Sequence, residues 1–173
     1  VVALGGVHAT LGAMRASHER AAIQEAGCGV LRQIAATADR RNVAAIARRA
    51  GVLEPVAHYA GTVGCGVLRQ IAAGGSNVDH ARRAGDAGAV EAVVAALEEH
   101  GEAPGCCEQA CGALRHLLHN CDANKRRLVE RSGIEAVVAA MRRHPDTVAL
   151  QEQGCWLIIY AAAMGSATVR VSS

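Results

Sequence analysis

Two stretches in the second half of the chain have nearly the same sequence, and this internal repetition limits the possible folds more than any other feature. GAVEAVVAALEEH starts at Gly88 and GIEAVVAAMRRH at Gly133, and the similar stretches EQACGALRHLL and EQGCWLIIYAA follow them. The glycines that open the units, Gly6, Gly51, Gly88 and Gly133, are 45, 37 and 45 residues apart. Repeats of this length stack on one another and bury a shared core. We therefore expect the function to reside on an extended surface rather than in a catalytic cleft.

A cysteine recurs in step with the glycines and indicates that one unit is shorter than the others. Cys28, Cys65, Cys111 and Cys155 follow their glycines by 22, 14, 23 and 22 residues. The second unit has therefore lost about two helical turns before its cysteine. We predict a single domain over residues 1–173, with units at about 1–50, 51–87, 88–132 and 133–173. The four cysteines are expected to share one core position.

Each complete unit is predicted to contain three helices. A short basic helix comes first, over 124–132 and 40–50, and a glycine ends it. A medium helix follows, with apolar residues three and four positions apart, as in Ile134, Val137 and Val138. The last helix is the longest and the most apolar. Because the 173 residues include no Phe, one Trp and two Tyr, we expect an all-α fold with a core of Ala, Val, Leu, Ile and Cys.

A short basic helix, a glycine, a medium helix and a long helix with the pattern Cys-x-x-Leu-Arg together resemble the armadillo repeat family. HEAT repeats, the nearest alternative, have two helices and lack the short first helix. The resemblance covers essentially the whole chain. It implies a right-handed α-solenoid, an armadillo-like superhelix of about four repeats with the second shortened. In this family the third helices line a concave wall that binds proteins and extended peptides.

Nuclear import adaptors of the importin-α type, which belong to the armadillo family, carry a Trp and, four residues later, an Asn on each third helix. In this chain the Trp position holds Gly29, Gly66, Gly112 and Trp156, and the Asn position holds Gln33, Gln70, His116 and Tyr160. The repeated pair of Trp and Asn is therefore missing in three units and altered in the fourth. Binding of basic localisation peptides is not expected.

Partner-binding residues are expected on the third helices, above all in the C-terminal half. Steps of three and four along these helices place the following candidates on the concave wall: Gln109, His116, Asn120, Gln153, Trp156 and Tyr160, with Gln33 and Gln70 in the first two units. Trp and Tyr combine a large contact area with a polar tip, and they recur at interface hot spots. Trp156 either contacts a partner or fills the space beside Gly112 of the preceding unit.

An arginine follows the leucine of the third helix in three units, at Arg32, Arg69 and Arg115. Glutamates lie seven residues before the arginine position, at Glu25, Glu108 and Glu152. We expect these side chains to form ion pairs between neighbouring units. The alternative is a row of basic groups that contacts an acidic partner.

No motif in the sequence indicates catalysis, and we expect neither an enzyme nor a cofactor. The sequence lacks the Gly-x-Ser-x-Gly, phosphate-loop, dinucleotide-binding and His-Glu-x-x-His patterns.

No metal is expected either, because no metal-ligand spacing occurs in the group formed by Cys106, Cys107, Cys111, Cys121, His100, His116 and His119. Arginines recur on the first helices, but the net charge is only +2 and no aromatic residues separate them, which disfavours nucleic acid as a partner.

The sequence gives few signs of location. We expect no membrane span and no secretory signal, because no apolar run is long enough and the chain does not start with a basic and then an apolar segment. Seven cysteines without a disulfide-type arrangement are typical of reduced thiols. An intracellular, cytoplasmic protein is predicted, and a cytoskeletal, ciliary or organellar assembly stays open.

Both ends of the predicted solenoid are apolar, at Val1, Val2, Leu4, Ile158 and Ile159. Residues 1–5 are predicted to end a leading helix and residues 165–173 to begin another, so the solenoid is incomplete or covered by partners at both ends. We predict a non-catalytic scaffold that binds a protein or an extended peptide along the concave wall. The alternative is a permanent structural subunit of a large assembly, in contact with several of its subunits. The oligomeric state is left open.

Overall fold

The computed structural model describes residues 2–17, 20–37, 62–73 and 78–168, and the regular structure in these ranges is entirely α-helical. The all-α prediction is confirmed to that extent. The helices run in the order α1 Val2–Ala16, α2 Ala21–Thr37, α5 Thr62–Ala73, α6 Val78–Asp86, α7 Ala89–Glu99, α8 Pro104–Leu118, α9 Asp122–Glu130, α10 Gly133–Arg143 and α11 Val148–Thr168. None of them has the length and hydropathy that a membrane span requires.

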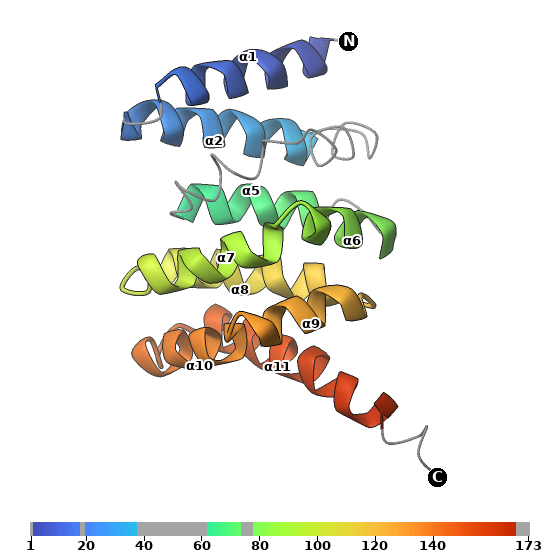
Figure 1. Ribbon diagram of the computed structural model, residues 1–173. Helices are drawn as coiled ribbons and strands as arrows, with labels where there is room; N and C mark the ends of the chain where they lie inside the picture. The colour runs from blue at the N-terminus through green and yellow to red at the C-terminus, as the bar shows by residue number, and fades with distance from the viewer. Residues whose placement is uncertain (1, 18–19, 38–61, 74–77, 169–173) are drawn as a thin grey trace.

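The helices are stacked in chain order, with α1 at one end of the stack and α10 and α11 at the other (Figure 1). α2 packs on α5, α5 on α8, and α8 on α11, so these helices form one continuous layer, which we call the α2–α5–α8–α11 layer. α1 packs against α2, α7 against α8, and α10 against α11. The short helices α6 and α9 each contact the helix that follows and lie against one another.

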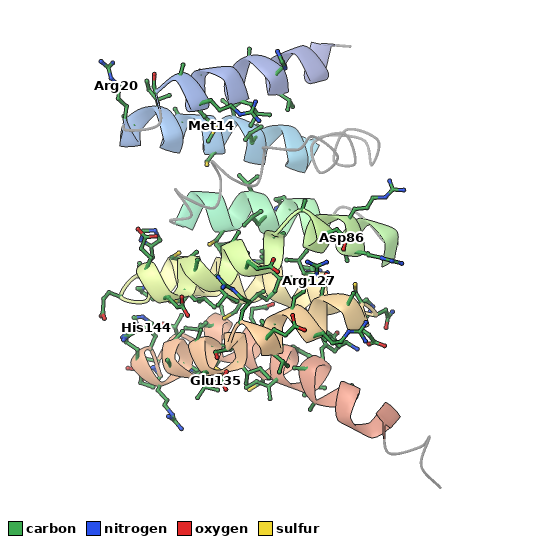
Figure 2. The ribbon with its side chains drawn as sticks, viewed as in Figure 1. Met14, Arg20, Asp86, Arg127, Glu135 and His144 are labelled. Atoms are coloured by element: carbon green, nitrogen blue, oxygen red, sulfur yellow. The ribbon has the colours of Figure 1, made fainter. Side chains whose placement is uncertain are left out.

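The core contains small and medium-sized aliphatic side chains and thiols, as the composition predicts. The face of α8 formed by Cys106, Ala110, Cys111, Leu114, Leu117 and Leu118 is fully buried. Small residues allow close contacts between helices. Met14 of α1 lies between α1 and α2 (Figure 2), where its side chain occupies the space that a Cβ at Gly27 would need.

Backbone geometry shifts the alignment of the last two units by one residue, because Gly88 is equivalent to Ser132 and not to Gly133. Gly88 precedes α7 in a left-handed conformation with φ 89°, and the residue with the same role before α10 is Ser132, with φ 52°. Ser132 follows Gly88 by 44 residues, the same interval that separates Cys111 from Cys155. The one-residue difference between units in the glycine-to-cysteine distance therefore disappears.

Gly133 is a glycine because of packing. It is the first residue of α10, and a Cβ there would collide with the side chains of Leu128 and Val94. α9, α10 and α7 thus meet closely at one point. Gly88 and Gly133 match in the sequence but are glycines for different reasons. Gly88 has a left-handed backbone, whereas a side chain at Gly133 would collide with its neighbours.

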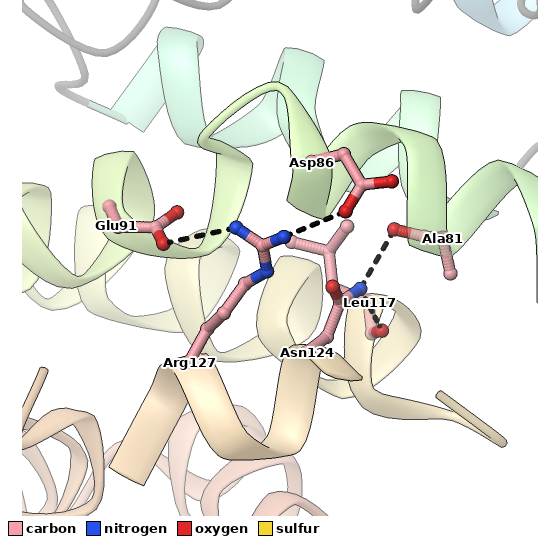
Figure 3. Close-up of polar contacts among 6 residues, drawn as sticks. All are labelled: Ala81, Asp86, Glu91, Leu117, Asn124 and Arg127. Atoms are coloured by element: carbon pink, nitrogen blue, oxygen red, sulfur yellow. Dashed lines mark hydrogen bonds and ion pairs between the residues drawn. The ribbon is translucent and has the colours of Figure 1, made fainter. Parts of the chain in front are cut away.

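A buried asparagine joins three helices of neighbouring units (Figure 3). The Nδ2 of Asn124 in α9 donates hydrogen bonds of 2.7 Å to the backbone oxygens of Ala81 in α6 and Leu117 in α8. Asn124 is 0% exposed, and its side chain fills the space beside Gly85. On the same helix, Arg127 forms ion pairs with Asp86 at 2.7 Å and with Glu91 at 3.7 Å.

The separate short helices predicted at the two ends of the chain are not present in the described residues. Gly5 and Gly6 lie inside α1, which is continuous from Val2 to Ala16, so no separate leading helix ends there. Residues 165–168 belong to α11 and do not begin a new helix. The apolar character of α11 continues past Tyr160, and no proline or left-handed residue ends it earlier.

Three predictions about the second unit lie outside the described residues. They are the short helix at 40–50, the medium helix of that unit and its shortening before Cys65.

One of the four cysteines expected in the core is exposed. Cys28, Cys65 and Cys111 are buried, but Cys155 is on the surface of α11. α8 is covered by α5 on one side and α11 on the other, whereas among the described helices α11 contacts α8, α9 and α10. A face of α11 therefore has no helix against it, and Cys155 lies there with Trp156 and Ile159, which are 43% and 55% exposed.

Candidate functional site

Packing of α8 against α11 brings several of the predicted partner-binding residues together. His116 on α8 and Tyr160 on α11 border a shared pocket with Arg115 and His119. Arg115 and His116 belong to the last turn of α8, and His119 follows its last residue, so the pocket forms where α8 ends beside the middle of α11. It is open to solvent and has a volume of about 230 Å³. This volume suits a single side chain.

Three aromatic rings form a row that begins in this pocket and continues along α11. The rings of His119 and Tyr160 are in an edge-to-face arrangement with centroids 5.4 Å apart. Tyr160 and Trp156, one turn apart on α11, are tilted by 37° with centroids 6.1 Å apart. Trp156 is 43% exposed and Tyr160 is partly buried against the core. The rings therefore offer a solvent-accessible surface that can pack against an apolar side chain.

The space beside Gly112 is occupied by Arg69 of the preceding unit. A Cβ at Gly112 would have Arg69 Cδ and Nε as its nearest neighbours, both at 3.0 Å. Arg69 Nη1 donates a 3.2 Å hydrogen bond to Gln109 Oε1 and lies 3.8 Å from a carboxylate oxygen of Glu108. This ion pair between units is of the kind predicted from the sequence. Because Arg69, and not Trp156, lies next to Gly112, the alternative that Trp156 fills this space has no support.

Arg115, in the equivalent position of the next unit, has no such partner. It forms no ion pair with any residue that the structure describes, and Glu152, its predicted partner, is exposed on α11. The Nε of Arg115 is buried without a hydrogen-bond acceptor, and Nη2 lies 3.4 Å from His116 Nε2. The predicted series of ion pairs therefore includes Arg69 but does not extend to Arg115.

His116 is affected by the same positive surroundings. Its pKa is lowered from the usual value, first because burial disfavours the charged imidazolium and then because Arg115, Arg69 and His119 are nearby positive or ionisable groups. His116 is thus held in the neutral form near pH 7. Its ring offers one donor and one acceptor nitrogen at the pocket.

Two predicted wall residues have other environments. Gln153 is 9% exposed, and its Oε1 is buried without a hydrogen-bond partner, so this side chain is largely covered instead of lining the surface. Asn120 is exposed but lies beyond the end of α8, in a turn with φ 53°. Asparagine tolerates this left-handed conformation better than most residues, which accounts for the helix ending before it.

The remaining candidates are distributed along the layer. Gln33 is exposed on α2, and Gln70 is partly exposed on α5, away from the pocket at α8 and α11. Arg32 belongs to α2, but its side chain lies outside the described part of the structure. Sequence reasoning considered His119 only as a metal ligand and missed its place in the pocket. The signal was its spacing of three residues from His116, which places both on one side of a helical turn.

Within the described ranges, no three His, Cys, Asp or Glu side chains lie close enough together to hold a metal ion. The thiols of Cys65 and Cys106 are 3.8 Å apart in the core between α5 and α8. Both are inaccessible to solvent.

Comparisons of the chain with protein-family models, with curated proteins and with solved structures found no match.

Proposed function

We propose that this protein is a non-catalytic scaffold that binds a protein or an extended peptide along the α2–α5–α8–α11 layer. The observation that carries this proposal is the open pocket between α8 and α11, beside the exposed ring of Trp156. Exposed aromatic residues next to half-buried polar groups are typical of protein-binding surfaces. The partly exposed residues Gln109 and Gln70 extend the polar part of this surface towards α5.

The fold that we propose for this function is an armadillo-like, right-handed α-solenoid of about four repeats. Its support is the 44-residue interval that relates α7, α8 and their caps to α10, α11 and theirs. In such a fold the helices of the α2–α5–α8–α11 layer form the concave wall. We further propose that the protein acts inside the cell, because none of its seven cysteines, all of them in the described ranges, forms a disulfide.

Selection of random peptides displayed on phage tests the proposal. The chain, with isotope-labelled backbone amides, is then titrated with one selected peptide, and the shifted NMR signals are assigned to helices. We expect the shifts to concentrate on α8 and α11, with smaller ones on α5. Shifts confined to α9 and α10, or a failure to select any peptide, would contradict binding along this layer.

A structural subunit of a larger assembly is the second candidate, and the uncovered face of α11 favours it. Ile159 is 55% exposed and Val148 is 78% exposed, so apolar side chains stay uncovered on this helix, as a contact surface for another subunit would require. Size-exclusion chromatography with light scattering separates the two functions. A stable monomer favours the scaffold, whereas association that an Ile159→Ser substitution abolishes favours the subunit.

A further inference from the structure

The pocket between α8 and α11 is positively charged and has no anion within the described structure. Arg69, Arg127, Arg143 and Lys125 each lie within 4.0 Å of a carboxylate, whereas none of the carboxylates in the described ranges lies that close to Arg115. Exposed arginines elsewhere on the surface are solvated and need no partner. Arg115 differs from them because it is only partly exposed and its Nε is buried without an acceptor.

The neighbours of Arg115 increase the need for a negative charge. Arg115 Nη2 donates a 3.4 Å hydrogen bond to Nε2 of the neutral His116, which supplies an acceptor but no negative charge to balance the guanidinium. His119 completes the pocket rim, and no Asp or Glu lines it. The C-terminal end of the α8 dipole offsets part of the positive charge, but it supplies no acceptor for Arg115 Nε.

The same pocket has an apolar border. Tyr160 forms one wall, and Trp156 continues the ring surface along α11. A ligand that places an anion at Arg115 would therefore place its neighbouring atoms against aromatic rings. A carboxylate on a short aliphatic stem, with an apolar residue close to it in sequence, has this combination, and the volume of about 230 Å³ accommodates such a side chain.

We propose that the Arg115–His116–His119–Tyr160 pocket binds the carboxylate of a Glu or Asp side chain in the partner peptide, while Trp156 contacts an adjacent apolar residue. Arg115 donates to the carboxylate through its guanidinium, and His116 or His119 donates a second hydrogen bond. Hydrogen bonds of this charge-assisted kind are among the stronger ones in proteins. The inference rests on the proposed function and specifies the chemistry of the partner.

Two synthetic peptides test the inference directly. Both are acetylated and amidated; the first is Leu-Glu-Ala-Leu-Glu-Leu and the second has Gln in place of each Glu. Binding is followed by the NMR signals of the Arg115 Nε–H group and the His116 ring. The glutamate peptide is expected to bind about tenfold more tightly or better, the ratio that one charge-assisted hydrogen bond provides. It should also shift the Arg115 signal and raise the pKa of His116.

Matched variants assign the effect to the pocket. Arg115→Gln should remove the preference for the glutamate peptide, whereas Arg126→Gln, the same change of charge at an exposed site on α9, should leave it intact. Circular dichroism verifies that both variants are folded. Equal affinity for the two peptides, a preference that survives Arg115→Gln, or no response of the Arg115 signal to either peptide would overturn the inference.

Two further results separate this inference from its alternatives. Inorganic phosphate that shifts the Arg115 signal at lower concentration than the glutamate peptide would identify a phosphate site and contradict a carboxylate site. A phage-selected peptide that binds equally well after its acidic residues are replaced by amides would sink the inference and leave the proposed function standing. Failure to select any peptide would affect the proposed function itself.

Discussion

Arg115 illustrates how one residue can weaken the fold and still be suited to binding. Its Nε is buried without an acceptor, and after burial itself Arg115 is the next largest cause that lowers the pKa of His116, followed by Arg69. A buried donor without a partner costs about 1–3 kcal/mol, and partial exposure of Arg115 places the cost at the low end. An anionic ligand would remove this cost on binding.

Replacing Arg115 by methionine is therefore expected to stabilise the free protein. The straight side chain keeps the packing and removes the unpaired cation, and a gain of about 1 kcal/mol would raise the Tm by about 2–4 °C for a chain of this size. Differential scanning calorimetry measures the change, with Arg126→Met as the control. A lower Tm for Arg115→Met would show that the guanidinium stabilises the free fold.

The buried thiols make the stability sensitive to alkaline pH. Burial raises the pKa of Cys28 to about 11 and that of Cys111 to about 12, from an ordinary value of 9.0. Above pH 9 these thiols ionise in the unfolded state before they ionise in the folded state, so stability falls as the pH rises, by about 1.4 kcal/mol per pH unit for each thiol.

Urea unfolding between pH 9 and pH 11 should show this slope. Other groups also titrate in this range, so the slope of wild type is compared with that of Cys111→Ala, which should be shallower, and of Cys155→Ala, which should be unchanged because Cys155 is exposed. Equal slopes in all three proteins would argue against protonated core thiols.

At the scale of helices, glycines in different settings should respond oppositely to alanine. Gly88 precedes α7 with φ 89°, where a Cβ is strained although no atom blocks it. Gly12 lies within α1 with open space around it. We expect Gly88→Ala to destabilise the protein by about 1 kcal/mol and Gly12→Ala to stabilise it by about 0.5–1 kcal/mol. Thermal unfolding of both variants tests this; stabilisation by Gly88→Ala would be inconsistent with the turn.

Asn124 connects α9 to α6 and α8, and its loss should loosen the contact between units. Removal of its amide leaves the backbone oxygens of Ala81 and Leu117 without their donor, at an expected cost of about 2–3 kcal/mol. Asn124→Asp should be at least as harmful as Asn124→Ala, because a carboxylate cannot donate. Chemical denaturation compares both with Glu130→Ala on the exposed side of α9. A milder effect of the aspartate would refute the donor role.

The sequence predicts the helices of this chain better than it predicts the candidate site. Apolar spacing located α7, α8 and α10 because a helix with one buried face requires that spacing. The same spacing placed Gln153 on the exposed concave wall, but this side chain is largely buried. A helical projection of the sequence does not show which residues neighbouring helices cover. The sequence left two alternatives open for Trp156, a partner contact or a filler of the space beside Gly112. Arg69 was not considered for this space, because the reach of a long side chain from another unit depends on the packing between units. Cys155 was expected in the core because it continues the series of buried cysteines. The spacing of the series does not reveal that α11, unlike α8, lacks a covering helix on one of its faces.

At the scale of the whole molecule, the described helices form a stack, and the binding surface that we propose lies on one continuous layer of it. The richest part of that surface is at α8 and α11, where the pocket, Trp156 and Tyr160 lie together. Val129 on α9 is exposed to a similar degree as Trp156, at 51%, but lies outside this layer. It therefore provides a matched control for the loss of an exposed apolar side chain.

The most direct measurement is the affinity of one phage-selected peptide for the wild-type chain and for its Trp156→Ala and Val129→Ala variants, determined by isothermal titration calorimetry. The account predicts that Trp156→Ala weakens binding by about tenfold or more, as truncation of a central aromatic residue does at an interface, and that Val129→Ala leaves the affinity unchanged. Unchanged affinity in Trp156→Ala, or a comparable loss in Val129→Ala, would contradict a binding surface on the α2–α5–α8–α11 layer.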